Sequence, residues 1–185
     1  DGIFQTQAEA DDFNSKFAKI VDYIDQEDLN CENKFIIFTG FVSTAIKLEE
    51  CFKNFFGEHT TCSFHTGKTP EEMQDAATLF QNDDECRFMI CDESGGEGRN
   101  FQVADYIVSV DLPWSPALLE QRIGRLDRIG REPGKDVVSI VVHSESTVEH
   151  DLFNIYDKGL NIFNKSLCGM EIAFEEIHNS IENAL

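Results

Sequence analysis

The sequence of 185 residues lacks any apolar run close to the roughly 20 residues that a membrane-spanning helix needs. It shows no signal peptide either, because its first residues, DGIFQTQAEADD, are acidic and contain no apolar core segment. We therefore expect no membrane partner. The lack of an initiating methionine is typical of a fragment of a longer protein, and processing of the chain would also explain it.

Cysteine and histidine are present, but without the spacings that bind metals. The six cysteines form no C-x-x-C pair and no regular framework. Cys62, Cys86 and Cys91 fall in or beside apolar runs, where free thiols behave as small hydrophobic side chains. This usage predicts a reduced, cytoplasmic protein. The five histidines have no mutual ligand spacing, so we predict no metal site.

Positive charge is scarce: 15 Lys and Arg residues stand against 35 Asp and Glu residues, and the formal net charge is -20. This balance argues against broad coating of the surface by nucleic acid. It argues less against a local site, because salt confines exposed charges to about 8–10 Å. Five of the basic residues lie between Arg122 and Lys135, so the basic charge is concentrated in one segment.

Short runs rich in Val, Ile and Phe alternate with helical patterns along the chain. Runs of this kind, without polar alternation, are typical of parallel strands that are buried on both faces. The pattern predicts an α/β fold, a three-layer doubly wound domain with a parallel sheet between helices. We expect the strands at residues 34–38, 60–64, 87–91, 106–110 and 137–142.

Helical signals occupy the segments between and beside these strands. Apolar residues recur at helical spacing in 43–56. Thr69 and Ser115 each precede a proline and are expected to cap the helices that follow. Residues 4–28 predict an added amphipathic helix. The expected organisation is an N-terminal helical segment (1–30), a central α/β domain (31–145) and a helical extension (146–185).

Two segments look like halves of an ATP site. HTGKT (65–69) contains the Gly-Lys-Thr of a phosphate-binding loop, but Cys62 stands where the motif needs its first glycine, five positions before Gly67. FMICDE (88–93) resembles an apolar strand followed by magnesium-binding acids. Without a phosphate-binding loop upstream, the acids of this segment have no bound nucleotide beside them. Neither segment is therefore predicted to form a complete ATP site.

The segment Glu120–Arg131, EQRIGRLDRIGR, places arginines at steps of three. On a helical wheel Leu119, Ile123 and Leu126 form an apolar stripe, and the arginines lie beside it. A solvated basic edge is the simplest interpretation. However, like charges repel by a few tenths of a kcal/mol per pair, and Gly124 costs roughly 1 kcal/mol in a helix interior. A helix against an anionic ligand gains from both features, because guanidinium groups match phosphate oxygens.

The arginine segment resembles motif VI of superfamily-two helicases and translocases, in the form that the Swi/Snf family uses. Residues 94–116 are similar to motif V and the segment after it, residues 34–45 to motif IV, and FHTGKTPEEM to the motif after that. Residues 156–169 are similar to the helical extension of bacterial members that associate with RNA polymerase. The resemblance implies the second RecA-like lobe of a two-lobe ATPase.

In such a motor ATP with Mg²⁺ is bound mainly by the first, N-terminal RecA-like lobe, which is therefore an expected partner. Double-stranded DNA is the expected substrate, and RNA polymerase a further partner. The resemblance implies that Arg125 and Arg128 are catalytic, with Arg128 as the arginine finger. It assigns a cofactor-binding role to Gln121, Arg122, Gly95, Gly96 and Glu97. For Arg122, an ion pair and a nucleotide contact stay equal alternatives.

The same resemblance assigns nucleic-acid contacts to Thr39, Gly40, Gly67, Lys68, Thr69, Gly98 and Asn100. His65 is interpreted as structural. Trp114 is interpreted as a packing residue, with stacking on nucleic acid as the alternative. The chain departs from the family pattern at Arg131, where Gln is usual, and at 73–74, where an arginine is missing; the second change leaves a phosphate contact in doubt.

Three functions remain open: the motor lobe of a double-stranded DNA translocase, the matching lobe of a strand-separating RNA or DNA helicase, and a non-catalytic interaction module. In each case the isolated chain is predicted to hydrolyse no ATP, because half of the site is missing.

Overall fold

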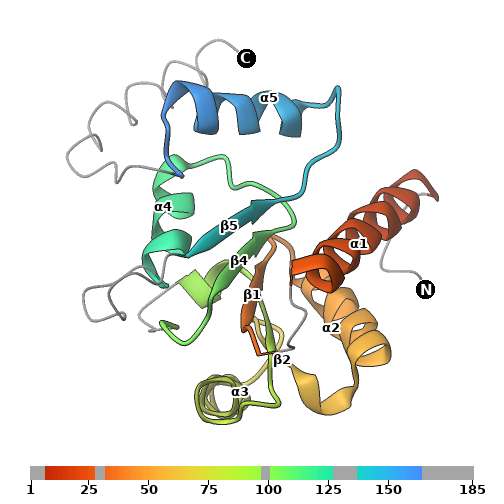
Figure 1. Ribbon diagram of the computed structural model, residues 1–185, viewed down its shortest axis with the longest axis vertical. Helices are drawn as coiled ribbons and strands as arrows, with labels where there is room; N and C mark the ends of the chain where they lie inside the picture. Colours follow the sequence, from red (N-terminus) through yellow and green to blue (C-terminus); the bar gives the residue numbers. More distant parts are fainter. Residues whose placement is uncertain (1–6, 28–31, 97–100, 127–136, 164–185) are drawn as a thin grey trace.

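A central sheet of five parallel strands organises the chain (Figure 1). The computed structural model describes residues 7–27, 32–96, 101–126 and 137–163. The strand order is β2-β3-β1-β4-β5. All five expected strands are confirmed: β1 (Phe35–Phe38), β2 (Thr61–Phe64), β3 (Phe88–Cys91), β4 (Tyr106–Ser109) and β5 (Val138–Val141).

Helices connect these strands and cover both faces of the sheet (Figure 1). Short 3₁₀ turns occupy Glu58–Thr60 and Glu93–Gly96, and one π-helical turn occupies Ile155–Gly159. The doubly wound α/β prediction is therefore confirmed. The helices are α1 (Gln7–Glu27), α2 (Val42–Phe56), α3 (Pro70–Asn82), α4 (Pro116–Gly124) and α5 (Val148–Asn154).

Alternate residues of each strand enter different cores, because successive side chains of a strand point to opposite faces. Phe35 and Ile37 of β1 pack with α1 and α2 on one face. Ile36 and Phe38 pack with α3 and with Leu126, just beyond α4, on the other. Both faces of β1 are fully buried, which explains why its sequence shows no polar alternation.

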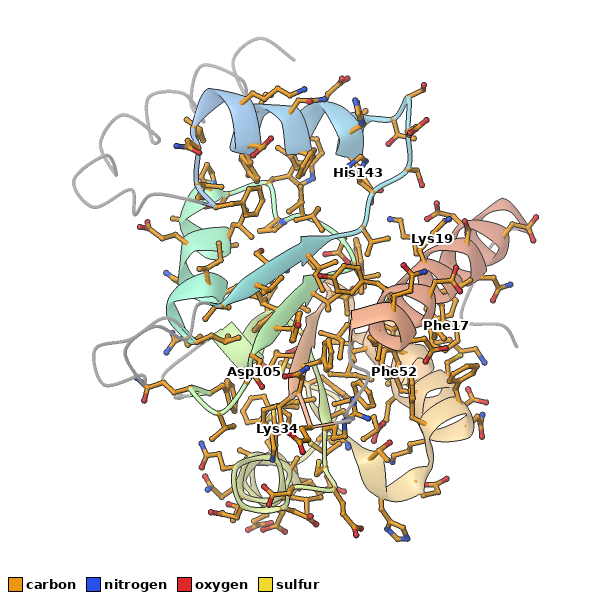
Figure 2. The ribbon with its side chains drawn as sticks, viewed as in Figure 1. Phe17, Lys19, Lys34, Phe52, Asp105 and His143 are labelled. Atoms are coloured by element: carbon orange, nitrogen blue, oxygen red, sulfur yellow. The ribbon has the colours of Figure 1, made fainter. Side chains whose placement is uncertain are left out.

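The N-terminal helix α1 belongs to this packed structure. Figure 2 shows Phe17 and Phe52 where α1 meets α2, and their rings lie edge to face with centroids 5.6 Å apart. Lys16, although charged, is only 8% exposed. Its Nζ donates to both carboxylate oxygens of Glu149 at 2.8 Å and to the carbonyl oxygen of Val110. This ion pair joins α1 to α5.

A third apolar cluster joins α4 to the segment that begins with α5. It consists of Leu112, Leu119, Leu152, Tyr156 and Ile162. The predicted extension is helical from Val148 to Gly159, and residues from 164 onward lie outside the described residues. None of the described helices has the length and apolar character needed to cross a membrane.

The helix starts agree with the sequence, but one cap and one helix end do not. Thr69 caps α3 in a full capping box with Glu72, as expected. Ser115 occupies the capping position of α4, yet its side chain makes no cap hydrogen bond. Helix α4 ends at Gly124, whereas the sequence predicts a helix that continues through Arg128. The energetic argument about a glycine in a helix interior was therefore wrong.

Candidate functional site

The carboxyl ends of β3, β1 and β4, three adjacent strands, bring three polar segments together. Thr39 and Gly40 follow β1, Glu93 follows β3, and Asp111 follows β4. Ligands of open α/β sheets bind at this edge, where the connections leave the sheet in opposite directions. Helix α4 adds Arg122 to the same edge.

Asp111 organises the strand ends. Its carboxylate accepts a hydrogen bond from the Thr39 hydroxyl at 2.5 Å and one from the Gly40 amide at 2.8 Å. Thr39 is fully buried. A Cβ on Gly40 would lie 3.4 Å from Asp111 Oδ1, so the lack of a side chain keeps this approach open. Both residues are predicted DNA contacts; in this structure their donors bind Asp111, and the DNA contact stays a prediction.

Arg122 is the largest fully buried side chain among the described residues. Its Nη2 forms an ion pair with Glu93 and lies 3.8 Å from Asp111 Oδ1. Its Nη1 donates to the carbonyl oxygen of Asp111 at 3.1 Å. The guanidinium also lies over the ring of Phe38, 5.3 Å from the centroid. Of the two alternatives left by the sequence, the structure contains the ion pair, and the nucleotide contact stays a prediction.

Gln121 and Arg125 lie elsewhere on the end of α4. Gln121 is exposed and Arg125 is half-buried. Both side chains are therefore more exposed than that of Arg122, which is buried. A Cβ on Gly124 would meet no atom within 4 Å, so packing does not require glycine there. Arg128, the predicted finger, lies outside the described residues.

The glycine-rich segment begins with an ordered turn. Gly95 and Gly96 end the 3₁₀ turn after β3. The Asp92 carboxylate accepts hydrogen bonds of 2.8 Å from the Thr66 amide and hydroxyl and one of 2.9 Å from the Ser94 amide. Burial alone would raise the pKa of Asp92, but these donors lower it. Glu97, Gly98 and Asn100 lie outside the described residues.

The loop between β2 and α3 holds Gly67, Lys68 and Thr69. The Gly67 amide donates to Nδ1 of buried His65 at 3.1 Å, and a Cβ on Gly67 would lie 2.9 Å from that atom. Burial lowers the pKa of His65. Lys68 Nζ lies 3.3 Å from Glu49 Oε1, and Thr69 caps α3. His65 therefore orders the loop, while the predicted DNA contacts of the loop remain untested.

Sequence reasoning missed Glu93, Asp111 and Glu49 as organising residues. A signal existed for Asp111, because an acid directly after a buried strand lies at the binding edge of a parallel sheet. The interpretation of Trp114 as a packing residue was wrong, since the side chain is 70% exposed. A segment that turns the chain between β4 and α4 can leave its largest side chain in solvent.

Comparisons with known proteins agree with this geometry. The family of the helicase conserved C-terminal domain matches residues 15–130. The chain is 37% identical over 153 residues to the RNA polymerase-associated protein RapA of Photobacterium profundum. That alignment covers 82% of this chain and only 15% of the length of the relative.

Two solved structures show the same fold. The C-terminal part of the Fun30 ATPase domain has a TM-score of 0.66 at 17% identity, covering 76% of this chain and 44% of its own. The Sulfolobus solfataricus SWI2/SNF2 ATPase core in complex with double-stranded DNA has a TM-score of 0.63 at 22% identity, covering 80% and 30%. The chain therefore belongs to the helicase C-terminal domain family, as a RecA-like second lobe of the Swi/Snf type.

Proposed function

We propose that the chain is the C-terminal motor lobe of an ATP-dependent, Swi/Snf-type translocase on double-stranded DNA. The lobe closes on an N-terminal RecA-like lobe of the same protein and supplies arginines to the phosphates of ATP. One observation carries the proposal: the family motifs on β1, β3, β4 and α4 converge at a single edge of the sheet.

The described residues fit one end of a nucleotide and not the whole of it. No phosphate loop is available, because Cys62 stands where that motif needs glycine. Among the described residues, both acids after β3 are already engaged, Asp92 by Thr66 and Ser94 and Glu93 by Arg122, so neither is free for Mg²⁺. Gln121 and Arg125, beside the open surface at Gly124, fit the phosphate end.

ATP with Mg²⁺, held mainly by the N-terminal lobe, supplies the phosphoryl group whose transfer to water drives the motor. The guanidinium groups of Arg125 and Arg128 neutralise negative charge that develops on the phosphate oxygens. In well-studied enzymes such a finger increases the rate by about 10³–10⁵-fold. Gly95, Gly96 and Glu97 complete the nucleotide side of the closed site.

The DNA side of the lobe uses the strand ends and the loop after β2. Backbone amides and small side chains there contact phosphates without reading the base sequence. This local contact is compatible with a net charge of -20, because DNA touches only one rim. We further propose a cytoplasmic protein and RNA polymerase as the object that the motor moves against. The DNA contacts are Thr39, Gly40, Gly67, Lys68, Thr69, Gly98 and Asn100.

The test is ATP hydrolysis by the full-length protein with duplex DNA, single-stranded DNA or RNA. The translocase predicts stimulation by duplex DNA without strand separation. Dependence on single strands together with unwinding would instead favour the strand-separating helicase. The chain of 185 residues alone is expected to hydrolyse no ATP. Robust turnover by this chain would contradict the prediction that half of the ATP site lies on the N-terminal lobe.

The catalytic assignment is tested with Arg125→Ala and Arg128→Ala in the same full-length protein. Each is expected to lower kcat by about 10³-fold or more. Lys19→Ala, which removes one exposed positive charge from α1, serves as the control. Unchanged hydrolysis in the Arg128 variant would leave the interaction module as the better function.

A further inference from the structure

The proposed function assigns no role to the buried guanidinium group of Arg122. The residue is 0% exposed, and its guanidinium bonds to residues that follow two different strands. Nη2 pairs with the Glu93 carboxylate after β3, and Nη1 donates to the carbonyl oxygen of Asp111 after β4. A buried cation is stable only when it is paired and hydrogen-bonded, so these partners fix the side chain where it is.

Arg122 therefore has a different environment from its neighbours on α4. Gln121 is exposed and Arg125 is half-buried, whereas Arg122 faces the sheet and the ring of Phe38. For Arg122 to reach a ligand, its guanidinium would have to leave Glu93 and Asp111. The two carboxylates would then lose the cation between them, an outcome that the strength of such pairs opposes.

A second contact joins α4 to the far end of the same glycine-rich segment. The Phe101 amide donates to the carbonyl oxygen of Arg125 at 3.2 Å. The Arg125 amide in turn donates to the carbonyl oxygen of Arg122, also at 3.2 Å. Glu93 and Phe101 flank residues 94–100, the glycine-rich start of the stretch that resembles motif V. The side chain of Arg122 thus bonds before this segment, and the backbone of Arg125 bonds after it.

We infer that Arg122 is a positioning residue, which with Glu93 and Asp111 fixes α4 against the ends of β3 and β4 and so sets the place of Arg125. This inference rests on the proposed function and concerns the same site. The guanidinium of Arg122 does not bind the nucleotide. It holds the helix end at the distance from β3 and β4 at which Arg125 meets the closing lobe.

The experiment measures kcat and KM for ATP in the full-length protein at saturating duplex DNA. The variants are Arg122→Lys, which keeps the charge but not the two-pronged geometry, Glu93→Gln, which removes only the charge, and the double variant. Each single change is expected to lower kcat by about 10–100-fold, the effect of a displacement of about 1 Å, with KM within about twofold. The double variant is expected to be no worse than the poorer single variant, because both changes break one interaction.

Several results would overturn the inference. A raised KM for Arg122→Lys with unchanged kinetics for Glu93→Gln would make Arg122 a nucleotide ligand. A kcat that returns to the parent value after correction for the folded fraction, measured by circular dichroism, would reduce the pair to a structural role. Glu50→Gln, which breaks the exposed pair with Lys47 on α2, is the matched control and should leave kcat unchanged.

If Arg122→Lys does not fold, Glu93→Gln can still test the inference, since the Glu93 side chain is 36% exposed. Positioning predicts that this variant binds ADP as the parent does but binds ADP with aluminium fluoride at least about tenfold more weakly. Equal binding of both would overturn the inference. Arg125→Ala separates the two proposals. If Arg125→Ala abolishes hydrolysis and Glu93→Gln does not reduce kcat, only the positioning role of Arg122 fails. If Arg125→Ala leaves hydrolysis intact, the proposed function itself fails.

Discussion

The hydroxyl of Tyr156 donates a hydrogen bond of 2.8 Å to the carbonyl oxygen of Pro113. Tyr156 comes from the π-helical turn after α5 and is 1% exposed, and burial raises its pKa well above the usual range. The bond holds the segment between β4 and α4 from its inner side. The next residue, Trp114, is therefore presented to solvent by a backbone that is anchored on the C-terminal extension.

Trp114→Ala is expected to change function without loss of stability. Its side chain is 70% exposed, so its removal should change the free energy of unfolding by less than about 0.5 kcal/mol. Stacking on an unpaired base is worth about 1–3 kcal/mol, so we expect the full-length variant to bind single-stranded DNA more weakly than the parent. Fluorescence anisotropy with a labelled single strand measures this affinity. Phe55→Ala is the matched control for DNA binding, as Phe55 lies on α2 and is 57% exposed. Parent-like affinity in the Trp114 variant would exclude the contact.

Gly124→Ala separates the requirements of folding from those of the ligand. No atom lies within 4 Å of the added Cβ, so the isolated chain should be as stable as the parent or slightly more stable. In the full-length protein we expect a lower kcat for ATP, because the methyl group occupies the surface on which the phosphate end is proposed to lie. A large loss of stability in urea unfolding would show that glycine is required by the backbone instead.

The lowered pKa of Glu49 predicts how the free energy of unfolding changes in acid. Burial alone would raise the pKa of Glu49, but hydrogen bonds from Lys53 and Ser63 and the charge of Lys68 outweigh it and lower the pKa from 4.5 to about 2. A lowered carboxyl pKa stabilises the fold above the unfolded value, and this contribution, at most about 3 kcal/mol, is lost as pH falls from about 4.5 towards 2.

The check is urea unfolding of the parent and of Glu49→Gln across this pH range. The parent should be the more stable at about pH 7, and the difference should shrink steadily below pH 4.5. Glu58→Gln, at an exposed acid near the same helix, is the control and should give no such trend. A difference that does not depend on pH would mean that Glu49 stabilises the fold by packing and not by charge.

Lys16→Met tests the link between α1 and α5. The substitution keeps the apolar length of the side chain but removes the donors to Glu149 and Val110. Hydrogen bonds to charged groups contribute about 1.5–3 kcal/mol each, and we expect a loss of about 2 kcal/mol in the free energy of unfolding. Limited proteolysis should also release α1 faster. The exposed Lys19→Met, on the same helix, should change neither quantity; equal effects would contradict a specific role of the ion pair.

The fold could be predicted from local patterns because each strand is buried on both faces. Phe35–Phe38 is apolar at every position, and such a run has few alternatives to a central strand of a parallel sheet. The start of α3 could be predicted equally well, since Thr69, Pro70 and Glu72 form its cap within four residues. These signals are local, so a single sequence contains them in full.

The site could be predicted only in part, because its contacts connect residues far apart in the chain. The arginine spacing identified α4, but it placed Arg122 with Arg125 on one ligand-facing sector. A helical wheel gives the direction of a side chain relative to its helix, not what lies opposite. Glu93 and Asp111 reach Arg122 only after β3 and β4 have taken their places on either side of β1.

By itself the sequence determined the α/β class, the five strands and the family, since hydrophobic burial and motif spacing depend on neighbours along the chain. The tertiary structure alone decided that Arg122 is enclosed, that Trp114 is exposed and that Lys16 joins α1 to α5. The reason is physical. The energy of a charge or an aromatic ring depends on the partners and the solvent around it, and those are fixed only when distant segments pack together.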